Sequence, residues 1–347
     1  MKEALIDNAL RVTVHDVPVP APGPGQLLIR TVVSGTNPKD WKMPKVWAPN
    51  AEPANHGDDI AGYVEAVGEG VSGFQKGDRV AAFHEMGTPH GSYAEYSIAW
   101  ARSTFRLPDH TTFEEAATIP LAAMTAALGL YQTLDLPLPW NPATQPLPLV
   151  IYGGATAVGS FAIKLAALSG VHPIIAVAGN GIPYVETLLN KDRGDAVIDY
   201  RKGESHVIDE IERIAGGDAV LQAFDTVSET RTLLAVDKAL APGRGRIVTV
   251  LPVPSKEVSA TVTNIMVGTV HSPRPGPGAV LGDREFGAVF FPFMGLGLEE
   301  GWFAGHPYEV LTGGLDALEG ALKDLEAGKN SAKKYLLRIG ENNGVSQ

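Results

Sequence analysis

The chain has 347 residues, of which 44% are apolar and 19% charged, and its formal net charge is −11. This length predicts two domains, and the composition is that of a folded protein and not of a disordered one. An acidic chain repels phosphate backbones and anionic lipids, so nucleic acid and membranes are not expected partners, and the absence of cysteine excludes disulfides, thiolate metal sites and cysteine nucleophiles.

The N-terminal third carries short runs of alternating apolar and polar residues, which predict β-strands. Glycine and proline interrupt these runs, so they favour a small barrel or sandwich. The first run lacks the apolar core of a signal peptide, and no apolar run reaches the roughly 18 residues of a membrane-spanning helix, so a cytoplasmic protein is expected. The predicted strands lie within residues 10–20, 26–38, 59–83 and 92–100.

A helix is predicted next, because residues 112–131 are rich in helix formers and follow two threonines that are suited to capping. Either Thr111 or Thr112 is the expected cap. The proline-rich residues 134–148 then predict a surface loop that is longer than most connections.

Strands and helices alternate from residue 149 to residue 251, which predicts a parallel, doubly wound sheet. The alternation starts with a short apolar strand, a glycine turn and a helix that ends at Gly170. One face of this helix carries Val158, Phe161, Ala162 and Leu165. Later strands are predicted within residues 173–179, 195–200, 219–227 and 246–251.

The C-terminal part predicts a buried apolar helix over residues 285–298 and an amphipathic helix over residues 315–328. A last strand is predicted over residues 333–339, and it should return to the first domain because chain termini tend to lie close together. The predicted fold class is therefore α/β, with a β-domain and a doubly wound domain. The expected boundaries are residues 1–120 with 303–347 for the former, and residues 121–302 for the latter.

The glycine turn is the sharpest local motif, Tyr152-Gly153-Gly154-Ala155-Thr156-Ala157-Val158-Gly159. It lies between a predicted strand and a predicted helix, where glycines allow close backbone approach and the helix N-terminus attracts a pyrophosphate. The match to G-x-G-x-x-G is imperfect, because Gly153, Ala155 and Val158 occupy the three positions. A tight turn without a ligand is the alternative, but the surrounding alternation of strands and helices favours a dinucleotide site.

The end of the second strand of this domain favours NADP over NAD. An acidic residue there would bind the ribose hydroxyls and repel a 2′-phosphate, but the strand ends in Ala178-Gly179-Asn180-Gly181. Tyr200 offers a hydroxyl and Arg201 a positive charge at the end of the next strand, although both could also be surface polar groups.

Together these residues resemble the medium-chain dehydrogenase/reductase family over nearly the whole chain. The resemblance implies an N-terminal GroES-like β-domain, a Rossmann domain and a C-terminal return to the first domain. The stretches that carry it are Asn37-Pro38-Lys39-Asp40-Trp41-Lys42 and residues 56–80, 107–131, 152–166 and 313–339.

Zinc is not expected, because the zinc-dependent members of the family need cysteine ligands. His56 alone cannot complete a tetrahedral site, so it is interpreted as a polar loop residue. The chain is similar to quinone reductases and more closely to the fungal trans-acting enoyl reductases of polyketide synthases, the lovastatin-pathway type. The features that favour the latter are the Asn37–Lys42 stretch, the Ala-Met-Thr-Ala segment around Thr125, and Gly-Lys-Asn-Ser-Ala-Lys-Lys-Tyr at 328–335.

The resemblance implies an NADPH site and a substrate site. The expected cofactor contacts are Lys39, Asp40, Trp41, Lys42, Ala155, Thr156, Ala157, Val158, Ala178, Gly179, Asn180, Gly181, Tyr200, Leu251, Pro252, Ser331 and Ala332. The expected substrate contacts are Thr125, Ala126, Ala127, Leu128, Gly129, Leu130, Tyr131, Gln132, Gly268, Thr269, Val270, His271 and Ser272. Many relatives carry Ser-Gly where this chain has Ser331-Ala332.

Reduction of an enoyl group needs a hydride, a proton and a donor for the developing enolate oxygen. By analogy Lys42 and Thr125 are the expected catalytic residues, although Lys42 could be an exposed lysine and Thr125 a packed helix residue. The sequence indicates no obvious acid for the proton, since nothing places Tyr63 or His84 at the site.

The implied substrate is an α,β-unsaturated thioester on an acyl carrier protein of a polyketide synthase. Lys39, Lys42 and Lys45 offer either a basic docking patch for that partner or a solvated turn. A free-standing quinone or enone reductase that uses NADPH is one alternative, and a non-catalytic NADPH-binding protein is another. The proline-rich residues 272–278 would blunt a sheet edge, which favours a monomer.

Overall fold

The computed structural model describes residues 1–217, 219–254, 257–273 and 282–341. Their contacts divide the chain into two compact units, residues 1–121 with 268–347 and residues 122–267. The predicted division placed residues 268–302 in the other domain. They belong to the first unit because helix α8 (Asp283–Glu300) packs on it, with Phe291 stacked on Phe105 of strand β7.

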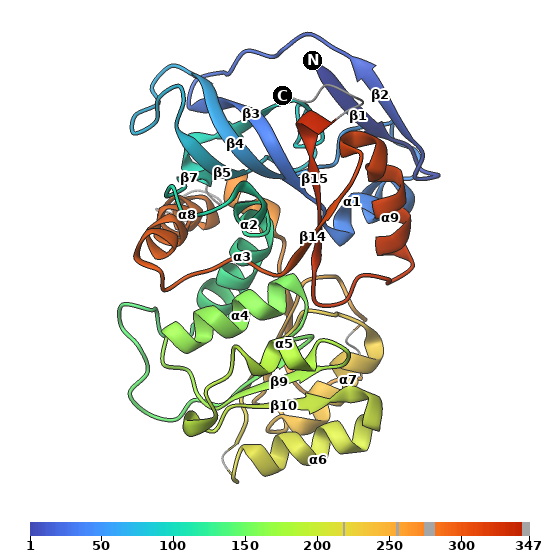
Figure 1. The fold of residues 1–347 in the computed structure, drawn as a ribbon. Coiled ribbons are helices and arrows are strands. Elements are labelled where there is room, and N and C mark those ends of the chain that lie inside the picture. The colour runs from blue at the N-terminus through green and yellow to red at the C-terminus, as the bar shows by residue number, and fades with distance from the viewer. Residues whose placement is uncertain (218, 255–256, 274–281, 342–347) are drawn as a thin grey trace. The chain divides into compact units, whose positions relative to one another are not determined.

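The first unit is built on a β-sheet, as the alternating N-terminal runs predict. Its strand order is β14-β15-β3-β4-β5-β7, with β6 also paired to β3, and a separate ribbon joins β1 to β2. Figure 1 shows the C-terminal strand β15 beside the N-terminal strand β3, which confirms the predicted return of the chain. The strands are β1 (Lys2–Ile6), β2 (Val12–Asp16), β3 (Gln26–Gly35), β4 (Asp59–Val67), β5 (Arg79–Phe83), β6 (Tyr96–Trp100), β7 (Thr104–Arg106), β14 (Tyr308–Leu311) and β15 (Lys334–Arg338).

Short helices border this sheet at the ends of its strands. Helix α9 packs its apolar face on the unit through Leu318, Leu322 and Leu325, and Gly328 follows it with a positive φ, as the amphipathic pattern predicts. The expected apolar helix is present as α8, but only part of its surface is buried. Pro292 lies inside this helix. The helices are α1 (Pro38–Lys42), α2 (Phe113–Ala116), α8 and α9 (Leu318–Glu326), with a π-helical turn over Met43–Trp47.

The predicted helix over residues 112–131 is present in three pieces. Thr112 is its cap, since its hydroxyl accepts a hydrogen bond from the Glu115 amide at 3.1 Å, and Thr111 is not. Pro120 cannot donate to a preceding carbonyl, so a new helix begins there. The pieces are α2, α3 (Pro120–Ala127) and a π-helical segment over Leu128–Thr133.

The second unit contains a parallel sheet in the order β10-β9-β8-β11-β12-β13. This order is that of a doubly wound nucleotide-binding fold and confirms the predicted fold class. The strands are β8 (Leu149–Tyr152), β9 (Ile174–Ala178), β10 (Ala196–Asp199), β11 (Gln222–Asp225), β12 (Arg246–Thr249) and β13 (Thr261–Asn264). The helices are α4 (Ala157–Leu168), α5 (Ile182–Glu186), α6 (Glu204–Ile214) and α7 (Thr230–Ala239).

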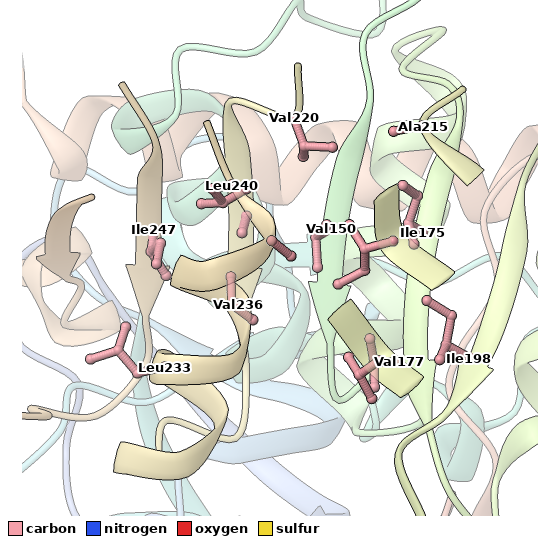
Figure 2. Packing of buried hydrophobic residues seen from close by; sticks show 14 residues of the cluster. Val150, Ile175, Val177, Ile198, Ala215, Val220, Leu233, Val236, Leu240 and Ile247 are labelled. Carbon is pink, nitrogen blue, oxygen red and sulfur yellow. The ribbon is translucent and has the colours of Figure 1, made fainter. Parts of the chain in front are cut away.

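One face of this sheet is buried under α6 and α7. Figure 2 shows Val150, Ile175 and Val177 of the strands in the same cluster as Leu233 and Val236 of α7. Because successive side chains of a strand alternate between faces, the intervening residues of β8 and β9 face the other layer, where α4 buries Phe161, Ala162 and Leu165. Gly170 follows α4 with a positive φ, as predicted.

The prediction of a monomer depends on a segment that the structure describes only in part. The proline-rich segment that favours a monomer, Ser272–Gly278, falls outside the described residues from position 274 onward. Within the described part of the chain, no helix is long and apolar enough to cross a membrane.

The buried face of the parallel sheet yields a stability prediction. Ile211 of α6 is fully buried in this core, so Ile211→Ala should lower the free energy of unfolding by about 2–5 kcal/mol. The neighbouring Glu212 is exposed, and Glu212→Ala should change it by no more than about 0.5 kcal/mol. Urea unfolding of both variants checks this, and equal effects would contradict the packing.

Candidate functional site

The glycine turn of the second unit follows β8 and leads directly into α4. Gly153 has a φ of +85°, a conformation that favours glycine, and the amides of Gly153 and Gly154 both donate to the Val177 carbonyl at 2.9 Å. Thr156 is the cap of α4, since its hydroxyl accepts from the Gly159 amide at 2.9 Å. The turn is therefore fixed by its own backbone.

This turn has the form of a cradle for a pyrophosphate. A Cβ at Gly159 would overlap the Gly153 carbonyl oxygen, so the helix approaches the turn as closely as glycine allows. Ala157 and Val158 lie in the first turn of α4, where the amides have no acceptor within the helix and the helix dipole is positive. Backbone amides at the N-terminus of a helix can bind phosphate oxygens, so the residues present here fit the pyrophosphate of a dinucleotide.

Thr226 supports the turn and was not singled out from the sequence. Its hydroxyl lies 2.9 Å from the Thr156 hydroxyl and donates to the Tyr152 carbonyl at 2.9 Å. Thr226 directly follows β11, which pairs with β8 in the parallel sheet. Residues after the carboxyl ends of such strands border the binding crevice, and that placement is the signal that could have identified it.

The end of β9 meets the end of β10 through a tyrosine. A Cβ at Gly179 would lie 2.7 Å from the Tyr200 ring, so glycine is what lets this ring lie against the backbone. Tyr200 itself is 42% exposed. The predicted residues Ala178–Gly181, Tyr200 and Leu251-Pro252 thus all follow carboxyl ends of strands in one sheet, and the structure brings them to one edge together with the glycine turn.

Arg201 is paired within the unit. Its guanidinium binds Asp199 with two contacts of 2.8 Å and donates to the Asn180 side chain at 2.6 Å. These hydrogen bonds lower the pKa of Asp199 to about 2. The positive charge expected here from the sequence is therefore compensated by a carboxylate.

In the first unit the predicted cofactor residues of α1 are held by a buried charge network. Asn37 caps the helix, and its amide donates to the Asp40 carboxylate at 2.7 Å. Tyr93, also fully buried, donates to the same oxygen at 2.5 Å. Asp40 has no exposed surface, so its contacts are with the protein.

Lys39 lies between two buried carboxylates. Its ammonium is 2.5 Å from Asp58 and 3.1 Å from Asp40, in ion pairs whose angles fall outside hydrogen-bond geometry, and it donates to the His56 carbonyl. Burial would lower the pKa of Lys39, but Asp58 and Asp40 raise it above its usual range. Burial raises the pKa of Asp58 to about 7. Because Lys39 is buried, it does not contribute to a basic surface patch with Lys42 and Lys45.

Lys42 at the end of α1 and Ala332 before β15 belong to two predicted cofactor segments, and their environments differ. The Lys42 ammonium lies over the Trp41 ring, 4.4 Å from its centroid. Lys45 pairs with Glu326 of α9. Ala332 has a φ of +53°, the conformation in which glycine is favoured and which costs another residue about 1–2 kcal/mol. The departure from Ser-Gly at this position therefore carries backbone strain.

The predicted substrate segment Thr125–Gln132 is mostly buried. Thr125 is 5% exposed. Two of its residues have packing partners inside the second unit: a Cβ at Gly129 would lie 2.5 Å from the Phe224 ring, and the Tyr131 hydroxyl donates to the Leu165 carbonyl at 3.0 Å. Substrate contact by this segment stays a prediction, and Gln132 is its exposed end.

The other predicted substrate segment, Gly268–Ser272, packs inside the first unit. The His271 ring lies 4.8 Å from the Phe83 ring, and Gly268 lies against Met86. His271 is 6% exposed, and neither ring nitrogen makes a hydrogen bond with good geometry, although the Phe83 carbonyl is near. Burial and the nearby Arg102 and His84 lower the pKa of His271 to about 3.

No group of three or more potential ligand side chains that could hold a metal ion is found among the residues described. Burial together with the nearby Lys39 ammonium lowers the pKa of His56 to about 4.

Comparison with known proteins supports the fold described above and indicates the family of the chain. Residues 23–109 match the alcohol dehydrogenase GroES-like domain. The chain is 43% identical to "Trans-enoyl reductase fsr4" of Gibberella fujikuroi over 90% of this chain and 91% of that protein, and 35% identical to "Trans-enoyl reductase resD" of Aspergillus sclerotiorum over 94% and 96%. An alcohol dehydrogenase superfamily protein from Novosphingobium aromaticivorans has the same fold, with a TM-score of 0.78, 24% identity and coverage of 98% and 99%.

The buried histidine yields a pH prediction. Below its ordinary pKa of 6.5 the unfolded chain binds a proton that the folded chain binds only near pH 3, so the folded state loses stability as pH falls through this range. His271 should contribute a loss of about 1.4 kcal/mol per pH unit, and His271→Phe should remove that part of the slope. Urea unfolding from about pH 7 to about pH 5 measures it. Parallel slopes for the two proteins would contradict this.

Proposed function

Since this chain belongs to the trans-enoyl reductases of the medium-chain dehydrogenase/reductase superfamily, we propose that it is an NADPH-dependent enoyl reductase. It acts in trans on an α,β-unsaturated polyketide thioester carried by an acyl carrier protein of a polyketide synthase. The observation that carries the proposal is the full-length match to curated trans-enoyl reductases. The glycine cradle at the carboxyl edge of a parallel sheet supports it independently of that match.

The residues proposed to hold the nucleotide divide between its two ends. Ala155–Val158 bind the pyrophosphate through backbone amides, and Tyr200 with Asn180 and Arg201 bind the 2′-phosphate. No acidic residue ends β9, which supports NADPH over NADH. Asp199 keeps the Arg201 guanidinium in place beside Asn180. The nicotinamide end is proposed to meet Trp41 and Lys42 of α1, Leu251-Pro252 and Ser331-Ala332, while the buried Lys39 and Asp40 hold α1 in place.

The proposed chemistry is conjugate reduction. NADPH, when bound, would supply the hydride for the β-carbon, and the resulting enolate would take up a proton from water at the α-carbon. Lys42 and Thr125 are proposed to donate hydrogen bonds to the thioester oxygen as negative charge develops on it, which stabilises the transition state more than the ground state. Lys42 is the candidate for this role because it ends α1, and its ammonium lies over the Trp41 ring, 4.4 Å from the centroid.

The first test of the function uses the lysine of α1. An enoyl thioester, offered free and on a carrier protein, should oxidise NADPH, with faster turnover on the carrier. Lys42→Ala should lower kcat by about 100-fold because it removes a donor to the developing oxyanion. Lys45→Ala is the matched control, since Lys45 is exposed and paired with Glu326, and it should leave kcat unchanged. Oxidation with quinones but with neither thioester would instead identify a free-standing quinone reductase.

A second test concerns the 2′-phosphate. Arg201→Ala leaves the Asp199 carboxylate uncompensated, so it should raise KM for NADPH by about 10-fold through repulsion and leave KM for NADH nearly unchanged. Asp199→Asn combined with Arg201→Ala should recover part of the loss, because the repelling charge is gone. Initial rates with both nucleotides measure the ratio. An unchanged preference in the single variant would assign the phosphate to other residues.

A further inference from the structure

One buried carboxylate of the first unit accepts hydrogen bonds from three separate parts of the chain. Asp59 begins β4 and has no exposed surface. One oxygen accepts from the Leu121 amide at 2.7 Å. The other accepts from the Asn37 side chain at 2.7 Å and from the Lys334 ammonium.

Each of these donors adjoins a segment of the proposed site. Asn37 is the cap of α1, which carries Lys39–Lys42. Lys334 begins β15 and follows Ser331-Ala332. Leu121 is the second residue of α3, the helix on which Thr125 lies one turn later. The cofactor segments and the start of the substrate helix therefore share a single acceptor group.

The surroundings of Asp59 are shaped for this arrangement. A Cβ at Gly35, directly opposite Asp59 in the β3–β4 ladder, would overlap the Ala117 carbonyl oxygen and lie 2.9 Å from the Lys334 side chain, so glycine lets both approach this strand end. Phe83 is opposite Asp59 in the β4–β5 ladder and packs on His271 of the second predicted substrate segment. Four segments that carry or adjoin predicted contacts with cofactor or substrate therefore approach the start of β4, where Asp59 lies. They are α1, the start of α3, Ser331-Ala332 and Gly268–Ser272.

A buried ion pair does not by itself indicate a gain in stability, so the presence of this pair calls for another explanation. The Lys334 side chain is 3% exposed, and removing two charges from water costs several kcal/mol per ion, so well-packed apolar residues would stabilise the fold as well or better. Directional hydrogen bonds are what a carboxylate adds that apolar packing does not. The hydrogen bonds that Asp59 accepts all come from segments next to the proposed site.

We infer that Asp59 is the positioning residue of the proposed active site: it fixes α1, the start of α3 and the segment before β15 relative to one another. This inference rests on the proposed function, because it is that function which makes these segments the cofactor and substrate contacts. Asp59 does not touch the substrate in this role. It acts through Asn37, Leu121 and Lys334.

The test is Asp59→Asn, which keeps the size of the side chain and removes its charge. NADPH binding, followed by its fluorescence, should weaken about 10-fold, because the charge-assisted hydrogen bonds that position two cofactor segments are lost. With an enoyl thioester, kcat should fall about 100-fold through misplacement of the reacting groups. The preference for NADPH over NADH should stay unchanged, since the residues proposed for the 2′-phosphate belong to the second unit.

Two further variants separate positioning from stability. Asp59→Asn with Lys334→Met leaves no unpaired buried ammonium, so the melting temperature should recover while kcat and NADPH binding do not. Asp195→Asn is the matched control, because Asp195 is a buried carboxylate of the second unit that accepts from His172 and the Ile174 and Asn190 amides. It should lower the melting temperature without weakening NADPH binding.

Recovery of binding and rate in the double variant would show that Asp59 only stabilises the fold, and the inference would be wrong. Equal weakening of NADPH binding by Asp195→Asn would have the same meaning. A wild-type protein that binds NADPH but reduces no enoyl thioester would contradict the proposed function alone. The NADPH affinities of the three variants would still decide the role of Asp59.

Discussion

The pair formed by Asp59 and Lys334 is the interaction on which the first unit depends. It joins the beginning of β4 to the last strand of the chain, and the same carboxylate accepts from Asn37 and Leu121. A side chain so placed cannot be solvated, so its charge is tolerated only because each oxygen is engaged. Lys39 and Asp58 form a second buried ion pair close by. This buried network contains the ammonium groups of Lys39 and Lys334 and the carboxylates of Asp40, Asp58 and Asp59. It limits how far the segments of the proposed site in this unit can move independently.

In the second unit, backbone hydrogen bonds hold the glycine turn at the proposed nucleotide site. The turn is also fixed by the absence of side chains at Gly153 and Gly159, with Thr156 and Thr226 closing the remaining polar contacts. At the exposed end of the proposed nucleotide site, Arg201 is paired with Asp199. The proposed phosphate-binding end is thus preformed by geometry, whereas the proposed reactive end is held by electrostatics.

The sequence predicted the parts of this architecture that local physics decides. Alternating runs, apolar strands and the glycine turn each carry their signal within a few residues, so β8, the turn and α4 could be placed and the cap of α2 narrowed to Thr111 or Thr112. The charge network could not be predicted, because Asp59 and Lys334 are 275 residues apart and nothing local distinguishes a buried lysine from an exposed one. Lys39 illustrates the difficulty, since it was grouped with surface lysines. The division by contacts differs from the expected boundary after residue 302 for a related reason: α8 packs on β7 through aromatic side chains that join distant residues. The contacts expected for Thr125 and Lys42 stay predictions.

The pair of Asp59 and Lys334 has an evolutionary consequence that glycine at 35 does not share. A side chain at position 35 would overlap the Ala117 carbonyl oxygen and lie 2.9 Å from the Lys334 side chain, so glycine is required there with or without the lysine. A lineage that lost the lysine would gain from a neutral residue at 59, because the buried carboxylate would have no opposite charge beside it, but it would keep glycine at 35. In a family alignment positions 59 and 334 should therefore covary, whereas glycine at 35 should stay the same whichever pair is present.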